Sequence, residues 1–196
     1  RRSKNSPFRD FYVWRDTDPG DTSDEVVFPD EEDSIWELDE RTGEWYLHHF
    51  YTHQPDLNLA NPAVMDEILR TVGFWLQLGI DGFRVDAVPF LMQNQENSGT
   101  KTEAVDPHEV LKEIRAFLGR RKGHAMLLGE VNVPHEEQFL FFGGEAGDEL
   151  HMMFDFVVMQ ATWLAFARQD PAPLVEAILA RPQIHPTCQW ATFLRN

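Results

Sequence analysis

A chain of 196 residues is long enough to form one domain with its own hydrophobic core. Its formal net charge of −16 argues against a nucleic-acid partner, because neutralising phosphates requires basic patches. The single cysteine excludes an internal disulfide, and no hydrophobic run approaches the length that spans a membrane. We therefore expect a cytoplasmic protein with no nucleic-acid or membrane partner, for which a neutral small molecule is a fitting ligand.

Residues 1–60 show no helix-length periodicity. Acidic and turn-forming residues dominate from Asp16 to Glu40, interrupted by the short apolar runs Val26–Phe28 and Ile35–Leu38. This texture predicts an irregular insertion domain over 1–60, made largely of surface loops. Its acidity is most simply that of a solvated surface, with cation binding as the alternative.

From residue 61 onward, helices and strands are expected to alternate. Asn61 is suited to cap a helix that begins at Pro62 and ends near Gly79, and an apolar strand follows over 82–90. The further predicted elements are a helix over 106–122, a strand ending at Glu130, a strand near Met152, helices over Val157–Arg168 and Leu174–Arg181, and a strand over 189–194. This alternation predicts parallel βα units with both faces of the sheet covered.

The stretch GFRVDAVPF, residues 82–90, places two charges in an apolar run. Side chains alternate along a strand, so Arg84 and Asp86 share one face. A solvated face would explain this in an antiparallel sheet, whereas in a parallel sheet catalytic groups gather where strands end. Asp86 and Glu130 both lie at such ends. Asp155 follows the next strand, where it either lines the rim of the site or, more simply, caps the following helix.

Two carboxylates at the ends of adjacent parallel strands can flank one glycosidic bond. Retaining hydrolysis requires such a pair roughly 5 Å apart, with one carboxylate ionised to attack and the other protonated to assist departure. Arg84 favours the ionised form of Asp86, whereas Glu130, near that negative charge in a partly dry site, should hold its proton longer. The residues therefore offer a nucleophile and an acid.

Three stretches, in this order along the chain, resemble the alpha-amylase family, glycoside hydrolase family 13. HQPDLN, residues 53–58, resembles the end of the family's inserted B domain, in the version typical of the oligo-1,6-glucosidase and trehalose synthase branch. GFRVDAVPF resembles the strand that carries the nucleophile, and LLGEV resembles the strand that carries the general acid/base. The resemblance implies an α/β fold, a partial (β/α)8 barrel with about its middle four strands over 61–196, preceded by a B-domain-like insertion over 1–60.

Carried over to this sequence, the resemblance implies Asp86 as the nucleophile, Glu130 as the acid/base, and Arg84 and His53 as substrate-binding residues. The barrel is expected to be truncated at both ends. A strand with a sugar-binding histidine would precede Arg1, and a third catalytic aspartate would follow directly after Asn196.

The resemblance also implies a possible structural calcium ion, although no cofactor is required for the reaction. Its ligands would be Asp56 and the main-chain carbonyls of Phe90 and Leu91. Gln93 stands where a carboxylate commonly follows, and a neutral amide would weaken a site for a hard cation.

Three activities are compatible with these features. DAVPFL after the nucleophile looks closest to the trehalose synthase subfamily, which implies a retaining enzyme that interconverts maltose and trehalose through a glucosyl-enzyme. VNVP after Glu130 departs from the alanine-asparagine-glutamine pattern expected there, so an α-glucosidase or α-amylase-type hydrolase that releases glucose is the alternative. A non-catalytic carbohydrate-binding or partner subunit is the third, because fold alone does not prove chemistry. The expected partners are small neutral α-glucosides: maltose, trehalose or short maltooligosaccharides.

Overall fold

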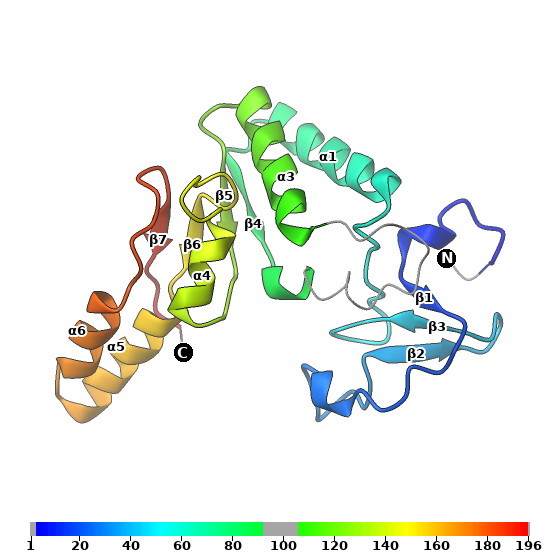
Figure 1. The fold of residues 1–196 in the computed structure, drawn as a ribbon, viewed down its shortest axis with the longest axis horizontal. Coiled ribbons are helices and arrows are strands. Elements are labelled where there is room, and N and C mark those ends of the chain that lie inside the picture. The colour runs from blue at the N-terminus through cyan, green and yellow to red at the C-terminus, as the bar shows by residue number, and fades with distance from the viewer. Residues whose placement is uncertain (1–2, 92–105, 196) are drawn as a thin grey trace. The chain divides into compact units, whose positions relative to one another are not determined.

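The computed structural model describes residues 3–91 and 106–195. The chain divides into two compact units, the first made of 1–70 with 90–107 and the second of 71–89 with 108–196. Each unit is described by itself (Figure 1). Within the described residues, no helix combines the length and the apolar character needed to cross a membrane.

The first unit contains a small antiparallel sheet that the sequence patterns did not reveal. Its strands are β1 (Trp14–Arg15), β2 (Trp36–Asp39) and β3 (Glu44–Leu47), in the order β1-β3-β2. Two short 3-10 helices, η1 (Arg9–Phe11) and η2 (Ser23–Glu25), precede β2, and turns and loops form most of the rest.

The sheet of the first unit packs around a small apolar core. Val13, Ile35, Trp36 and Leu47 are all buried in one cluster, against which Val26 and Trp45 pack. The run Ile35–Leu38 therefore has a structural role, since it supplies one side of this core and begins the edge strand β2.

Helix α1 (Pro62–Gln77) begins and ends where the sequence predicts. The Asn61 side chain accepts a hydrogen bond from the backbone N–H of Ala63 at 3.0 Å, which satisfies one of the free donors of the first turn. At the other end Gly79 adopts a φ of 100°, a left-handed conformation that glycine enters without steric cost. Strand β4 begins at Gly82, with two residues between it and this glycine.

The second unit is built on a parallel sheet of four strands in the order β4-β5-β6-β7 (Figure 1). The strands are β4 (Gly82–Val85), β5 (Met126–Gly129), β6 (Met152–Phe154) and β7 (Gln189–Ala191). The helices between them are α3 (Pro107–Arg121), α4 (His135–Phe141), α5 (Phe156–Arg168) and α6 (Ala172–Leu179). The predicted alternation is thereby confirmed, and α4 is the one helix among these that the sequence analysis did not predict.

Asp155, directly after β6, joins three helical segments from a fully buried position. Its Oδ1 caps α5 by accepting the backbone N–H of Val158 at 2.9 Å, as the sequence indicated. The same oxygen lies 3.2 Å from His135 Nε2 at the start of α4, and Oδ2 accepts from Arg181 Nε at 2.6 Å. One carboxylate thus holds α4, α5 and the residues after α6 at the end of β6.

Replacing Asp155 by alanine should lower the free energy of unfolding by about 3 kcal/mol or more, because removing one partner of a buried ion pair leaves the other uncompensated. Asp170→Ala is the matched control. Asp170 is an exposed carboxylate that accepts the N–H of Ala172 at 3.0 Å, and its loss should cost about 1 kcal/mol or less. Urea denaturation of the complete protein at neutral pH measures both changes. Equal losses for the two variants would contradict the joining role of Asp155.

His151 ties β5 to the loop before β6. Its Nδ1 accepts the backbone N–H of Leu127 at 3.0 Å, a bond that only an unprotonated nitrogen can accept. Burial, with a smaller effect of the Arg115 charge, lowers the pKa of His151 from 6.5 to about 4. The folded protein therefore holds this imidazole neutral over a range in which the unfolded chain protonates it.

Because the unfolded state binds more protons between these two pKa values, the stability that His151 contributes is present above pH 6.5 and is lost as the pH falls towards about 4. In His151→Gln the amide oxygen can still accept a hydrogen bond but does not titrate. This variant should show a flatter decline in denaturation midpoint over that window, whereas the same change at the exposed His53 should leave the decline unaltered. An identical decline in His151→Gln and the unmodified protein would show that this imidazole does not titrate as described.

Candidate active site

The carboxyl ends of β4 and β5 form one edge in the second unit. The two strands pair in parallel with Val85 opposite Gly129, and the pairing continues past them. The backbone N–H of Glu130 donates to the carbonyl of Val85 at 2.9 Å, and the N–H of Val88 donates to the carbonyl of Glu130 at 3.1 Å. Backbone bonds therefore fix the position of Glu130 beside the residues that follow β4.

Arg84 connects the two carboxylates at this edge. One terminal nitrogen of its guanidinium lies 2.5 Å from Asp86 Oδ1, and the other lies 2.5 Å from Glu130 Oε2. The sequence placed Arg84 and Asp86 on one face of a strand, and the structure brings them together with Glu130. The sequence analysis did not predict that the guanidinium would also bind Glu130. One guanidinium thus contacts both carboxylates.

The two carboxylates differ in their surroundings. The side chain of Glu130 is 27% exposed, and that of Asp86 is 70% exposed. Burial raises the pKa of Glu130. A hydrogen bond in which protonated Glu130 donates to the Asp86 carboxylate raises it further, and so does the charge of Asp86. The Arg84 guanidinium and the backbone N–H of Ala87 act in the opposite direction without cancelling the increase. The pKa of Glu130 is therefore raised, in the direction that the sequence predicts for the acid of the pair.

The backbone around the two carboxylates is unusual in two places. Ala87, next to Asp86, has a φ of 46°, a left-handed conformation that costs an alanine about 1 kcal/mol. This turn directs the Ala87 N–H to the Glu130 carboxylate. Gly129 precedes Glu130, and a Cβ atom there would lie 2.3 Å from the Leu150 side chain, so no larger residue fits without displacing Leu150. Sequence patterns gave no sign of either constraint.

The remaining residues proposed from the sequence belong to the first unit, and substrate binding by His53 stays a prediction. His53 is exposed, and its ring stacks on that of Tyr51 with centroids 5.4 Å apart. Asp56 Oδ2 accepts the backbone N–H of His49 at 3.2 Å and lies 2.5 Å from Nδ1 of the same residue. The His49 ring in turn lies 5.6 Å from that of Phe90.

In the described residues the Asp56 carboxylate is engaged with His49. Calcium takes six to eight oxygen ligands, and one oxygen of Asp56 is already bound to His49 by two contacts. Over residues 3–91 and 106–195, no three His, Cys, Asp or Glu side chains gather as a metal would require. Gln93 lies outside the described residues. Calcium binding through Asp56, Phe90 and Leu91 remains a prediction.

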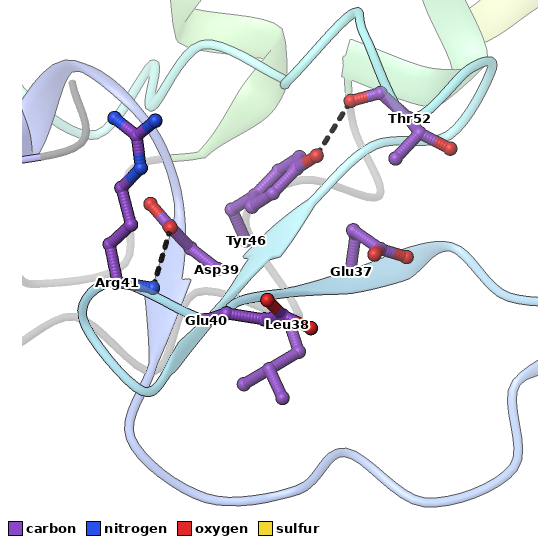
Figure 2. A pocket seen from close by; sticks show the side chains of 7 residues that line it. All are labelled: Glu37, Leu38, Asp39, Glu40, Arg41, Tyr46 and Thr52. Atoms are coloured by element: carbon purple, nitrogen blue, oxygen red, sulfur yellow. Dashed lines mark hydrogen bonds between the residues drawn. The ribbon is translucent and has the colours of Figure 1, made fainter.

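A pocket of about 400 Å³ lies along β2 and the start of β3 in the first unit (Figure 2). Three carboxylates line it, and burial together with the charges of Glu32 and Glu40 raises the pKa of Glu37. The Oδ2 atom of Asp39 has no hydrogen-bond partner in the described part of the chain, but it is sealed from solvent. Figure 2 shows that the Tyr46 hydroxyl donates a hydrogen bond to the Thr52 carbonyl, so the hydroxyl hydrogen is not free to bind a ligand. The pocket therefore offers a ligand little beyond exposed charge.

A parallel α/β sheet with two carboxylates at the ends of adjacent strands is typical of the class of barrel glycosidases and glycosyltransferases. The family model for the alpha amylase catalytic domain matches residues 1–186. The chain belongs to the alpha-amylase family.

Individual relatives agree with this assignment. A trehalose synthase from Pimelobacter sp. (strain R48) is 41% identical over 204 residues, which cover 100% of this chain and 35% of the relative. An oligo-1,6-glucosidase from Parageobacillus thermoglucosidasius is 37% identical over 173 residues, 80% of this chain and 30% of the relative. The chain thus spans about a third of the length of these curated relatives.

A solved structure confirms the fold. The alpha-amylase from H. orenii superposes with a TM-score of 0.77 over 99% of this chain and 37% of its own, at 22% sequence identity. At that identity the likeness speaks for the fold alone. The predicted partial α/β barrel with four parallel strands is confirmed.

Two substitutions should move the pKa of Glu130 in opposite directions. Asp86→Asn removes a like charge and should lower it, whereas Arg84→Met removes the opposing positive charge and should raise it. Titration of the ¹³C-labelled carboxyl carbons by NMR measures the shift directly. Arg168→Met, on α5, is the control and should leave the value unchanged. Shifts of the same sign in both variants would contradict the arrangement around Arg84.

Proposed function

We propose that the complete protein is a retaining enzyme acting on α-glucosides, in the manner of a trehalose synthase that interconverts maltose and trehalose. The observation that carries the proposal is the Arg84 guanidinium, which holds Asp86 and Glu130 together at the ends of adjacent strands. The similarity to trehalose synthases, which extends over the whole of this chain, supports the choice of substrate.

In the first step Asp86 attacks the anomeric carbon of the substrate. The contact with Arg84 orients this carboxylate, and its exposed side chain is open to a sugar. Glu130 donates its proton to the glycosidic oxygen as the bond from that oxygen to the anomeric carbon breaks. The products are a glucosyl ester on Asp86 and one free glucose. The shared contact with Arg84 keeps the two carboxylates near each other, as this retaining route requires.

In the second step Glu130, now ionised, takes a proton from the incoming hydroxyl. If the anomeric hydroxyl of the retained glucose attacks the ester, the product is trehalose, and if water attacks, the product is a second glucose. All atoms balance without a cofactor. The acceptor decides between isomerase and hydrolase, because both share the first step.

Hydrolysis is the second candidate. The oligo-1,6-glucosidase relative and the VNVP sequence after Glu130 support it. Both candidates use small neutral α-glucosides, which suits a chain without basic patches, and we propose a cytoplasmic location for either. If the protein is instead a non-catalytic subunit, no glycosidic bond is broken.

Incubating the complete protein with maltose and resolving the products by carbohydrate chromatography tests these alternatives. Trehalose as the main product is the expected result, glucose alone would identify a hydrolase, and unchanged maltose would support a non-catalytic role. Asp86→Asn should lower turnover at least a thousandfold, since the nucleophile is lost. Undiminished turnover in that variant would remove Asp86 from the mechanism.

A further inference from the structure

Glu130 is held from two sides, and only one of them belongs to the strand pair described above. On the β4 side, the carbonyl of Val85 and the N–H of Val88 bind the Glu130 backbone. On the other side the chain turns through residues 131–134 into α4. Because α4 begins five residues after Glu130, it is the nearest rigid element that can fix the direction in which the chain leaves the site.

Gln138 is the residue of α4 that reaches back to this turn. Its side chain is fully buried, and Nε2 donates to the carbonyl of Val131 at 2.9 Å. Val131 is itself fully buried and directly follows Glu130. Its carbonyl has therefore lost access to water, and the amide of Gln138 supplies the hydrogen bond that replaces it.

The cost of placing Gln138 here suggests a purpose beyond packing. Its Oε1 atom is buried and has no hydrogen-bond partner among the described residues, and a buried unpaired carbonyl costs about 1–3 kcal/mol. An apolar side chain of similar length would fill the same space without that cost. What it could not supply is the N–H for the Val131 carbonyl.

Helix α4 is anchored firmly enough to act as a reference point. His135, in its first turn, lies 3.2 Å from the buried Asp155 carboxylate, which is also bound to Arg181 and the N-terminus of α5. At its other end, the ring of Phe142 packs edge-on against Trp190 of β7, with centroids 5.0 Å apart. The bond from Gln138 thus ties the residue after Glu130 to a helix that is anchored at the end of β6 and on β7.

We propose that Gln138 is a positioning residue for Glu130, setting the direction of the acid/base carboxylate by fixing the peptide that follows it. The inference rests on the proposed function, in which Glu130 protonates the leaving group. Proton transfer requires the donor within hydrogen-bond reach and aligned with the glycosidic oxygen, and misplacement of the donor slows that step. Loss of the Gln138 bond should therefore affect poor leaving groups, which need the proton, far more than activated ones.

The test compares Gln138→Met, which keeps the length but removes the donor, with the unmodified complete protein on a series of aryl α-glucosides. In the variant, kcat/KM should fall roughly tenfold for the poorest leaving groups and less than twofold for 4-nitrophenyl α-glucoside, which steepens the plot against leaving-group pKa. Equal losses across the series would overturn the inference, because they would show a smaller fraction of folded enzyme rather than a misplaced acid.

Thr162→Val is the matched control, since it also removes a side-chain hydrogen bond to a backbone carbonyl, from Thr162 Oγ1 to Val158 at 2.6 Å, but on α5. It should leave the slope unchanged, and a steeper slope would contradict a specific role for Gln138. Gln138→Asn, whose shorter amide cannot span the same distance, should repeat the steepening if Gln138→Met does not fold.

A readout that needs no turnover separates this inference from the proposed function. The ¹³C carboxyl signal of Glu130 should shift or broaden in Gln138→Met and stay unchanged in Thr162→Val. An unmoved signal in Gln138→Met would overturn the positioning role. If the unmodified protein cleaves none of the glucosides, the proposed function fails, while this NMR comparison still decides whether Gln138 orients Glu130.

Discussion

The parallel pairing of β4 with β5 is the constraint on which the site depends. Arg84 and Glu130 are 46 residues apart in the chain, and only this pairing brings them to one edge. Parallel strands run in the same direction, so the residues that follow them emerge side by side. The extra backbone bonds between Val85, Val88 and Glu130 extend this order just beyond the strands, where regular structure ordinarily gives way to loops.

Burial then gives the two carboxylates different properties from similar positions. Asp86 and Glu130 share one guanidinium, yet Glu130 is the more enclosed, and the loss of water around it favours its neutral form. The positive charge of Arg84 lowers the pKa of Glu130 and the negative charge of Asp86 raises it, and the net effect with burial is an increase. The sheet geometry brings the two carboxylates together, and the difference in their surroundings favours Glu130 as the acid and Asp86 as the nucleophile.

The helices and strands that could be predicted are those that a pattern of neighbouring residues in the sequence marks. Asn61 and Pro62 indicate the start of α1, and Asp155 indicates the start of α5, because capping residues and first-turn prolines act over a few residues. The short strands of the first unit left no such pattern, since two to four residues are too few for an alternation to stand out. Helix α4, seven residues long with buried polar side chains at His135 and Gln138, resembles a loop in composition.

The same distinction holds for the candidate site. Arg84, Asp86 and Glu130 could be found because strand periodicity and strand ends are visible in the sequence. Contacts between distant segments, such as Gln138 with Val131 or Arg84 with Glu130, depend on tertiary packing and have no local signature. The contact of Asp56 with the imidazole of His49 is of the same kind, since the resemblance points to Asp56 as a metal ligand but no local pattern indicates His49 as its neighbour.

The left-handed conformation of Ala87 implies a compromise between stability and precision at the corner next to Asp86. Glycine would occupy this conformation without strain, but it would also widen the range of backbone states open to the chain. A β-branched side chain would restrict the backbone further but could not enter this region without a larger penalty. Alanine is intermediate between glycine and a β-branched residue in both strain and rigidity. A substitution that removes the strain at this position therefore also makes the turn that directs the Ala87 N–H to Glu130 less rigid.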